Sequence, residues 1–373
     1  MKVLVWQWGR RGAGPRFAAC LADALRGRHG IDVTLSLCQD AEILATANPP
    51  QCEMPVRTYT GMVSFLLRLV TAPFALPLLL LRLSRIMPDL AICAMPGPLD
   101  PLMGLALRIL RARLVVVVHD ADPHPGDGFP GQMLLQRVLC RMAHGLAVLC
   151  DHVGSRLREQ SPSRIVIPFE HPPFAFDLPP SDRAPGGRHL LCFGRLLPYK
   201  GLDLLAEALT LVPAGCDVRV VGSGPETPAL DALRASPGVT VENRWVPEAE
   251  IGGLLAWSDA VILPYREASQ SGVAAAALAA GRPVIATDVG GLREQLSAAP
   301  HALVCEPDAS SLAHAIGHWL EAPHQIAPRA DAAAAWRDAA TRLLAAIATT
   351  LPPKRGLRLA HRPLTLPIAL RRQ

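Results

Sequence analysis

Two cationic side chains in the segment FGRLLPYKGLDLLAEAL (193–209) have the types and spacing that bind a diphosphate. Arg195 and Lys200 flank a short loop that follows an apolar run and leads into a helical one. Lysine occurs only at positions 2, 200 and 354, so a lysine at this junction is unusual in an arginine-rich chain. A planar guanidinium and an ammonium point charge suit two adjacent phosphates, and each charge-assisted hydrogen bond contributes about 1.5–3 kcal/mol.

A second anion site is predicted where the apolar run AVILP (260–264) is followed by Ser-Gln-Ser-Gly-Val and then by an alanine-rich helix. The first N–H groups of a helix have no acceptor within the helix. Ser271, Gly272 and Val273 can therefore present backbone N–H groups and a hydroxyl to a phosphate.

One acid and one histidine complete the candidate crevice. Glu267 is the only acid between Asp259 and Asp288, and its carboxylate is predicted to orient sugar hydroxyls, with an ordinary exposed loop acid as the alternative. His119 follows the apolar run LVVVV (114–118). The carboxyl end of a parallel strand faces the ligand crevice, where a neutral imidazole can hydrogen-bond a phosphate or a sugar hydroxyl.

The turn GRRGAGP (9–15) is a weaker anion signal. Gly12 can expose backbone N–H groups there, and Pro15 suits the first turn of a helix, although a plain tight turn is the alternative. The turn is not G-x-G-x-x-G, and no acid ends the second predicted strand, which argues against a nicotinamide cofactor.

No metal site is predicted. Asp120 and Asp122 resemble a chelating Asp-x-Asp pair, but such triplets arise often by chance and the prolines and glycine that follow indicate an ordinary loop. His314 and His318 lie four apart on a predicted helix, without the intervening glutamate or a third ligand that a zinc site needs.

All of these residues lie near the ends of short apolar runs that predict β-strands. The runs are continuous rather than alternating, which is typical of strands buried on both faces of a parallel sheet. They span 2–8, 32–37, 90–95, 114–118, 146–150 and 164–168, then 189–194, 218–222, 239–243, 260–264, 283–287 and 302–306. Because helical stretches separate them, the predicted fold class is α/β, with two doubly wound Rossmann-like domains facing across a cleft.

Five prolines and two glycines in HPPFAFDLPPSDRAPGG (171–187) predict the junction between the domains. We expect an N-terminal domain at 1–172, a linker at 173–187 and a C-terminal domain at 188–340. A last helix and a basic tail at 341–373 are expected to return to the N-terminal domain.

The segment MVSFLLRLVTAPFALPLLLLRLSR (62–85) is the most apolar in the chain. Its uncharged core, 69–81, would span roughly 20 Å as a helix, against about 30 Å for a bilayer core, so we expect it to lie in the membrane interface, kinked at Pro73 and Pro77. No acid occurs between Glu53 and Asp89, which favours an anionic leaflet. A buried core helix is the alternative.

Charge and cysteine content bear on partners and compartment. The formal charge is +4 for 1–187, −5 for 188–351 and +6 for the last 22 residues, so an anionic surface is expected to meet the first domain and the tail. Aromatic residues make up only 5% of the chain and none lies among the arginines of the tail, so nucleic acid is not an expected partner. Nine cysteines without a Cys-x-x-Cys pair, and an N-terminal apolar stretch too short for a signal peptide, predict a cytoplasmic protein.

With these features, the chain resembles the family 4 glycosyltransferases of the GT-B fold over nearly its whole length. Three motifs carry the resemblance, namely Phe193-Gly194-Arg195 with Tyr199-Lys200-Gly201, then Val221-Gly222-Ser223-Gly224-Pro225, then Gly281-Arg282-Pro283-Val284-Ile285-Ala286-Thr287 with Gly290-Gly291 and Glu294.

The resemblance implies a retaining hexosyltransferase that moves a sugar from a nucleotide-sugar donor to an acceptor hydroxyl without a metal or other cofactor. The N-terminal domain would be the acceptor side and the C-terminal domain the donor side. Arg195 and Lys200 would bind the donor diphosphate and offset charge on the leaving group, and His119 would line the reaction centre. The residues expected to be catalytic are His119, Arg195, Lys200 and Glu267, and those expected to bind the donor are Gly12, Gly222, Ser271, Gly272 and Val273.

The sequence departs from the family at the sugar site. Members normally have two glutamates eight residues apart, but counting forward from Glu267 reaches Ala275. Counting back from Gly281 places the pair at Ala276 and Ala268. The Ser-Gln-Ser-Gly variant occurs in some members, so activity is still expected.

The expected function is sugar transfer to a lipid-linked or polysaccharide acceptor in cell-surface polysaccharide or glycolipid synthesis, by an enzyme peripheral to the inner face of the cell membrane. A sugar-nucleotide epimerase of the same fold is the first alternative, although the crevice offers only Glu267 and His119 as acid and base. A non-catalytic nucleotide-sugar or carbohydrate-binding module is the second.

Overall fold

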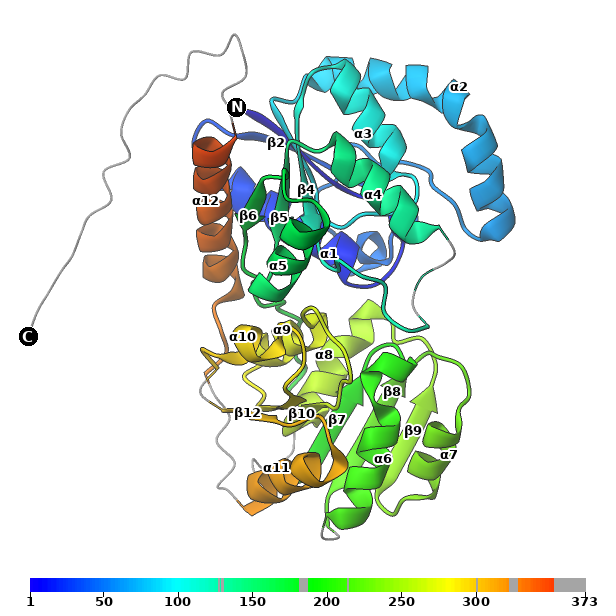
Figure 1. The fold of residues 1–373 in the computed structure, drawn as a ribbon, viewed down its shortest axis with the longest axis vertical. Coiled ribbons are helices and arrows are strands. Elements are labelled where there is room, and N and C mark those ends of the chain that lie inside the picture. The colour runs from blue at the N-terminus through cyan, green and yellow to red at the C-terminus, as the bar shows by residue number, and fades with distance from the viewer. Residues whose placement is uncertain are drawn as a thin grey trace, which may run out of the picture.

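The computed structural model describes residues 1–126, 128, 131–180, 187–212, 215–299, 301–321 and 328–351. It consists of two α/β domains, one above the other in Figure 1, each built on a six-stranded sheet. Every strand pairing is parallel, which confirms the predicted fold class. Part of the predicted linker (181–186) and the basic tail (352–373) lie outside the described residues.

The N-terminal sheet has the strand order β2-β1-β3-β4-β5-β6. Its strands are β1 (Lys2–Gln7), β2 (Asp32–Leu37), β3 (Leu90–Cys93), β4 (Arg113–Val118), β5 (Gly145–Val148) and β6 (Val166–Pro168). Val3 and Val5 of β1 enter one hydrophobic cluster, whereas Leu4 and Trp6 enter another on the opposite face. The continuous apolar run of β1 is thus explained by burial on both faces.

The C-terminal sheet repeats this arrangement with the order β12-β11-β10-β7-β8-β9. Its strands are β7 (His189–Phe193), β8 (Asp217–Gly222), β9 (Val239–Asn243), β10 (Ala260–Leu263), β11 (Val284–Thr287) and β12 (Ala302–Cys305). Leu190 and Leu191 of the central strand β7 again enter separate clusters on the two faces.

Helices cover both faces of each sheet (Figure 1). In the first domain these are α1 (Ala13–Arg26), α2 (Met62–Ile86), α3 (Asp100–Ile109), α4 (Gln132–Met142), α5 (Asp151–Gln160) and the short 3₁₀ helix η1 (Glu42–Ala45). In the second they are η2 (Pro198–Lys200), α6 (Leu202–Leu211), α7 (Pro228–Ala235), α8 (Glu248–Trp257), α9 (Gly272–Ala279), α10 (Leu292–Leu296) and α11 (Ala309–Glu321).

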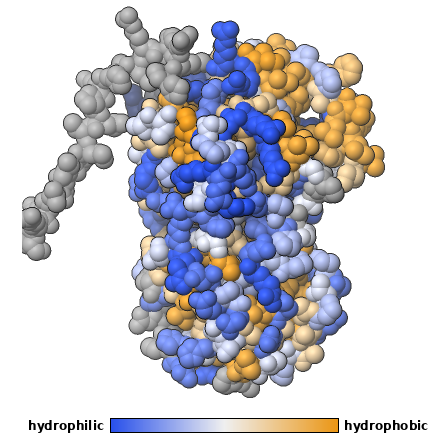
Figure 2. Space-filling view, viewed as in Figure 1, coloured by the Kyte–Doolittle hydropathy of each residue, from blue (hydrophilic) through white to orange (hydrophobic). Residues whose placement is uncertain are grey.

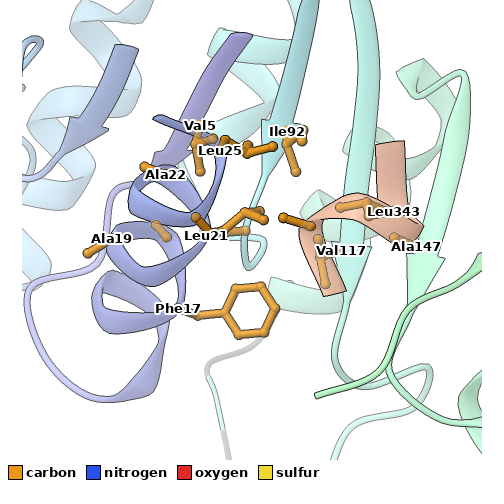
Figure 3. Close-up of a cluster of buried hydrophobic side chains, with 14 of the residues drawn as sticks. Val5, Phe17, Ala19, Leu21, Ala22, Leu25, Ile92, Val117, Ala147 and Leu343 are labelled. Atoms are coloured by element: carbon orange, nitrogen blue, oxygen red, sulfur yellow. The ribbon is translucent and has the colours of Figure 1, made fainter. Parts of the chain in front are cut away.

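The last described helix, α12 (Ala332–Thr350), packs on the N-terminal domain, against α1 and β6. Leu343 of α12 joins the cluster that contains Leu21 of α1 and Val117 of β4 (Figure 3). The ring of Trp336 meets that of Phe17 edge to face with centroids 4.9 Å apart, and its indole N–H donates to the carbonyl of Pro173 at 2.9 Å. The chain therefore crosses between the domains twice.

Helix α2 is long and apolar enough to cross a membrane, yet it lies on the outside of the domain, bending as it runs (Figure 1). Only Phe65, Leu79 and Leu83 of its 25 residues are buried. Its outer side forms an apolar patch, visible in orange in Figure 2, whose exposed members are Met62, Val63, Leu66, Leu67, Leu69, Val70, Phe74, Leu78 and Leu81. The alternative of a buried core helix is therefore wrong.

Candidate functional site

The N-termini of α1 and α9 approach each other across the cleft between the domains. A Cβ atom built on Gly272, the first residue of α9, would lie 3.5 Å from the Cβ of Ala13, the first residue of α1. The guanidinium of Arg16 fixes this approach, because its Nε–H donates to Glu248 of α8 at 2.6 Å and its Nη1–H to the carbonyl of Ala175 at 2.8 Å. Two positive helix ends therefore border one space, which favours an anion there.

Gly12 caps α1 at the edge of this space. Its φ of +81° lies in the left-handed region that favours glycine, and a side chain there would meet no atom within 4 Å. The turn thus leaves room beside the helix N-terminus, as expected for backbone that approaches a ligand.

The predicted diphosphate ligands lie on the side of the cleft that the C-terminal domain forms. The Lys200 ammonium is 3.6 Å from the ring centroid of Tyr265, and Nη2–H of Arg195 donates to the Tyr199 hydroxyl at 2.9 Å. Gly201 makes this arrangement possible, since its φ is +63° and a Cβ there would overlap the carbonyl oxygen of Pro264. The loop that carries Lys200 therefore rests directly on the loop that precedes α9.

Ser271 holds the loop together rather than facing a ligand. It is buried, its hydroxyl accepts from the N–H of Ala274 at 3.2 Å, and its own N–H donates to Gln295 Oε1 at 2.8 Å. The prediction that its backbone N–H is free for an anion is therefore wrong, whereas its hydroxyl also lies 3.2 Å from the Tyr265 hydroxyl. Gly272 and Val273, which follow it, supply the first N–H groups of α9.

His119 is buried, with both ring nitrogens hydrogen-bonded. Its Nε2 lies 2.9 Å from the carbonyl oxygen of Ala94, and its Nδ1 lies 3.1 Å from the amide nitrogen of Gln270 in the other domain. Burial lowers the pKa of His119, so the ring is neutral near pH 7. The predicted hydrogen bond from this imidazole to a phosphate or sugar is not available in this arrangement, because protein groups occupy both nitrogens.

Gly222 has a structural reason to be glycine. It ends β8, and a Cβ there would overlap the carbonyl oxygen of Gly194 at the end of β7. The Val-Gly-Ser-Gly-Pro motif thus brings the backbones of β7 and β8 into contact at their carboxyl ends.

Glu267 belongs to a polar cluster that joins the two domains. The Nε2 of His124 lies 3.0 Å from Asp120, and its Nδ1 lies 3.6 Å from the half-exposed carboxylate of Glu267. The ring of His124 also stacks on that of Tyr199, with centroids 4.8 Å apart. The hydrogen bond to Asp120 raises the pKa of His124, and although burial raises the pKa of Asp120, the bond to His124 brings it below its usual value.

A cavity of about 350 Å³ lies beside this cluster, between the loops after β4 and β10. Polar side chains from both domains line it, among them Asp122, His124, Arg156, Arg266, Glu267 and Ser269. Within the described part of the chain, no group of three or more His, Cys, Asp or Glu side chains is placed to hold a metal ion.

Sequence reasoning did not assign roles to Gln270, Gln295 or His124. Gln270 lies within the Ser-Gln-Ser-Gly motif, so its place beside the α9 N-terminus was a usable signal. Gln295 and His124 come from α10 and a loop of the other domain, and only the tertiary fold brings them to the cleft.

The second domain is similar to a known protein family. Residues 187–322 match the model for "Glycosyl transferases group 1". A D-inositol 3-phosphate glycosyltransferase of Jonesia denitrificans is 39% identical over 122 residues, which cover 29% of each chain. A GDP-mannose:glycolipid 4-beta-D-mannosyltransferase of Xanthomonas campestris pv. campestris is 27% identical over 199 residues, covering 50% of this chain and 53% of that one. The chain thus matches between about a third and a half of the length of these relatives.

Solved structures match both domains. Anabaena HepE, determined in complex with UDP and glucose, has a TM-score of 0.64 at 19% identity, covering 92% of this chain and 95% of that one. At this identity the likeness establishes the fold, in which two parallel sheets face each other across a cleft.

Proposed function

Because residues 187–322 belong to the group 1 glycosyltransferases, also called family 4, and the chain has the GT-B fold, we propose that this protein transfers a hexose from a nucleotide-sugar donor to an acceptor hydroxyl with retention of configuration. The observation that carries the proposal is the anion site between the domains. There the N-termini of α1 and α9 converge beside the loop that holds Arg195 and Lys200.

In this proposal Arg195 and Lys200 bind the donor diphosphate and stabilise the charge that develops on the leaving nucleoside diphosphate. Stacking over Tyr265 and Tyr199 fixes the Lys200 ammonium in place, with ring centroids at 3.6 and 5.0 Å. The N–H groups of Gly272 and Val273 and the turn at Gly12 supply further donors to the phosphates.

The sugar site has to work without the usual pair of glutamates. Ala268 and Ala276, which occupy those positions, are both buried. Glu267 points outward with its side chain 53% exposed, beside His124 and the cavity. We retain it as a proposed contact to the transferred sugar, reached from that cavity. The group 1 family is typically metal-independent, and we propose that this reaction needs no metal.

The proposed acceptor is a lipid-linked glycan or glycolipid on the inner face of the cell membrane. Support comes from the apolar patch on α2 and the absence of acids from 54 to 88, which suit an anionic interface. The Xanthomonas relative is itself described as acting on a glycolipid. In this arrangement α2 lies in the cytoplasmic leaflet and the N-terminal domain presents the acceptor, in cell-surface polysaccharide or glycolipid synthesis.

The catalytic proposal is tested with purified protein, UDP-glucose and GDP-mannose, and lipid extract as the acceptor source. We expect acceptor-dependent release of nucleoside diphosphate that persists in EDTA. Lys200→Ala should lower the rate at least tenfold, because it removes the ammonium from the anion site. Lys2→Ala serves as the matched control and should leave the rate unchanged, because Lys2 is exposed at the N-terminal end of β1. Equal rates for Lys200→Ala and wild type would contradict the proposal.

The same assay separates the alternatives. Conversion of the donor sugar without any acceptor would favour the epimerase, and donor binding without turnover under any condition would favour a non-catalytic module.

Membrane association is tested by flotation with vesicles of phosphatidylcholine alone or with phosphatidylglycerol. We expect binding to the anionic vesicles that weakens but persists in high salt, since apolar insertion accompanies charge attraction. Recovery entirely in the unbound fraction would contradict it.

A further inference from the structure

Gln270 links the two domains through His119. It precedes Ser271, the N-cap residue of α9, and its Nε2 lies 3.1 Å from Nδ1 of His119 at the end of β4. The other ring nitrogen of His119 lies 2.9 Å from the carbonyl oxygen of Ala94, which only accepts. Nε2 of His119 must therefore carry the proton, and in the neutral ring Nδ1 must accept.

This tautomer fixes the orientation of the Gln270 amide. Its NH₂ group donates to Nδ1, because the opposite orientation would set the lone pairs of Oε1 against those of the ring nitrogen. Oε1 is then directed away from His119. It is buried and has no hydrogen-bond partner among the described residues. Buried acceptors in native proteins are nearly always hydrogen-bonded, so such an atom points to a missing donor.

The chemistry around this oxygen restricts what the donor can be. A phosphate at the neighbouring helix N-terminus would bring only acceptor oxygens to Oε1 and repel it. A sugar hydroxyl, by contrast, carries the O–H that Oε1 lacks. A neutral amide also suits a buried position beside a neutral histidine better than a carboxylate, whose desolvation costs more.

We propose that Gln270 is the residue that selects the transferred sugar, with its Oε1 accepting a hydrogen bond from one donor-sugar hydroxyl while its NH₂ stays bound to His119. The proposal rests on the function proposed above. In this assignment the Gln270 amide supplies the hydrogen-bond acceptor that Ala268 and Ala276 cannot supply. His119 is then a positioning residue that orients the amide.

The test compares nucleotide binding with nucleotide-sugar binding by calorimetry, using UDP, GDP, UDP-glucose and GDP-mannose. For Gln270→Leu we expect an unchanged Kd for the nucleoside diphosphate and a roughly tenfold weaker Kd for the nucleotide sugar. Gln295→Met is the matched control, since Gln295 holds the main chain of Ser271 at 2.8 and 2.9 Å. This control should weaken nucleotide and nucleotide sugar alike, because it disturbs the loop rather than a sugar contact.

Deoxyfluoro analogues of the sugar that binds supply the decisive measurement, since fluorine cannot donate a hydrogen bond. In the wild type one position should lose about tenfold in affinity when fluorinated, and in Gln270→Leu the same analogue should lose nothing further. An equal loss in both proteins, or weaker nucleoside diphosphate binding by a folded Gln270→Leu, would overturn the assignment. Failure of the wild type to bind any of the four probes would instead overturn the proposed function, and this inference with it.

Discussion

The two sides of the cleft are built by different means. On the side of the C-terminal domain, the proposed donor side, backbone meets backbone, because side chains at Gly201, Gly222 and Gly224 would overlap the carbonyl oxygens of Pro264, Gly194 and Leu196. On the side of the N-terminal domain, the proposed acceptor side, individual side chains set the geometry. His119 is held by Ala94 and Gln270, and Asp100, the buried first residue of α3, accepts from the N–H of Gly97 at 2.7 Å.

The two sides should therefore tolerate substitutions differently. Backbone contacts leave no room for a methyl group but involve no titratable atom, whereas side-chain contacts can be altered by a single proton. The outer surfaces differ as well, since the acceptor side carries the apolar patch on α2. Substitutions on one side, paired with controls, test this contrast.

The largest effect is expected for Gly222→Ala on the donor side. The added methyl group would overlap the Gly194 carbonyl, and only a shift of the β7 or β8 backbone relieves it, which we expect to cost about 3 kcal/mol of unfolding free energy. Gly253→Ala is the control, because Gly253 is exposed in α8 with no atom within 4 Å of a new Cβ and should gain up to about 1 kcal/mol. Urea unfolding measures both, and similar midpoints would refute the backbone-contact account.

Asp100→Asn should reveal the proton-sensitive character of the acceptor side. Burial raises the pKa of Asp100 to about 7, so the folded protein binds a proton that the unfolded chain releases near pH 4. Wild-type stability therefore falls as pH rises from about 4 to 7, whereas Asn stays neutral and keeps an acceptor for Gly97. We expect the variant to gain about 3 kcal/mol relative to wild type between pH 5 and pH 8, measured by urea unfolding at each pH. A pH-independent difference would show that Asp100 is charged when folded.

Phe74→Glu tests the apolar patch. Phe74 is 82% exposed, so the substitution should leave unfolding unchanged while weakening binding to phosphatidylglycerol vesicles about tenfold. Leu211→Glu on the donor side is the matched control, because Leu211 is 59% exposed at the end of α6, away from α2, and should bind vesicles like the wild type. Equal loss in both variants would mean that binding is not localised to α2.

The same contrast explains what the sequence could predict. The twelve strands were predictable because burial on both faces leaves continuous apolar runs, and the glycines of 193–225 were visible because a backbone contact requires glycine locally. Ser271 was misjudged because its partner Gln295 comes from another helix. For His119 the error had a similar cause, since Gln270 lies 151 residues away and leaves no local pattern. Side-chain pairs between distant segments are set by the tertiary fold, and the local sequence around each partner does not predict them.

The smallest effect is expected at His124, where the two sides meet. The hydrogen bond to Asp120 raises the pKa of His124 in the folded protein. The contribution of this ion pair to the free energy of unfolding is therefore complete below the unfolded pKa near 6.5, and it is lost as pH rises through the higher folded pKa. His124→Gln should therefore cost up to about 1 kcal/mol of unfolding free energy at pH 6 and less at pH 8.5, because a partly exposed pair is screened by solvent. Asp120→Asn, which removes the carboxylate partner, should show the same pH trend in urea unfolding. A cost for His124→Gln that grows with pH would mean that stacking on Tyr199, rather than charge, joins the two sides here.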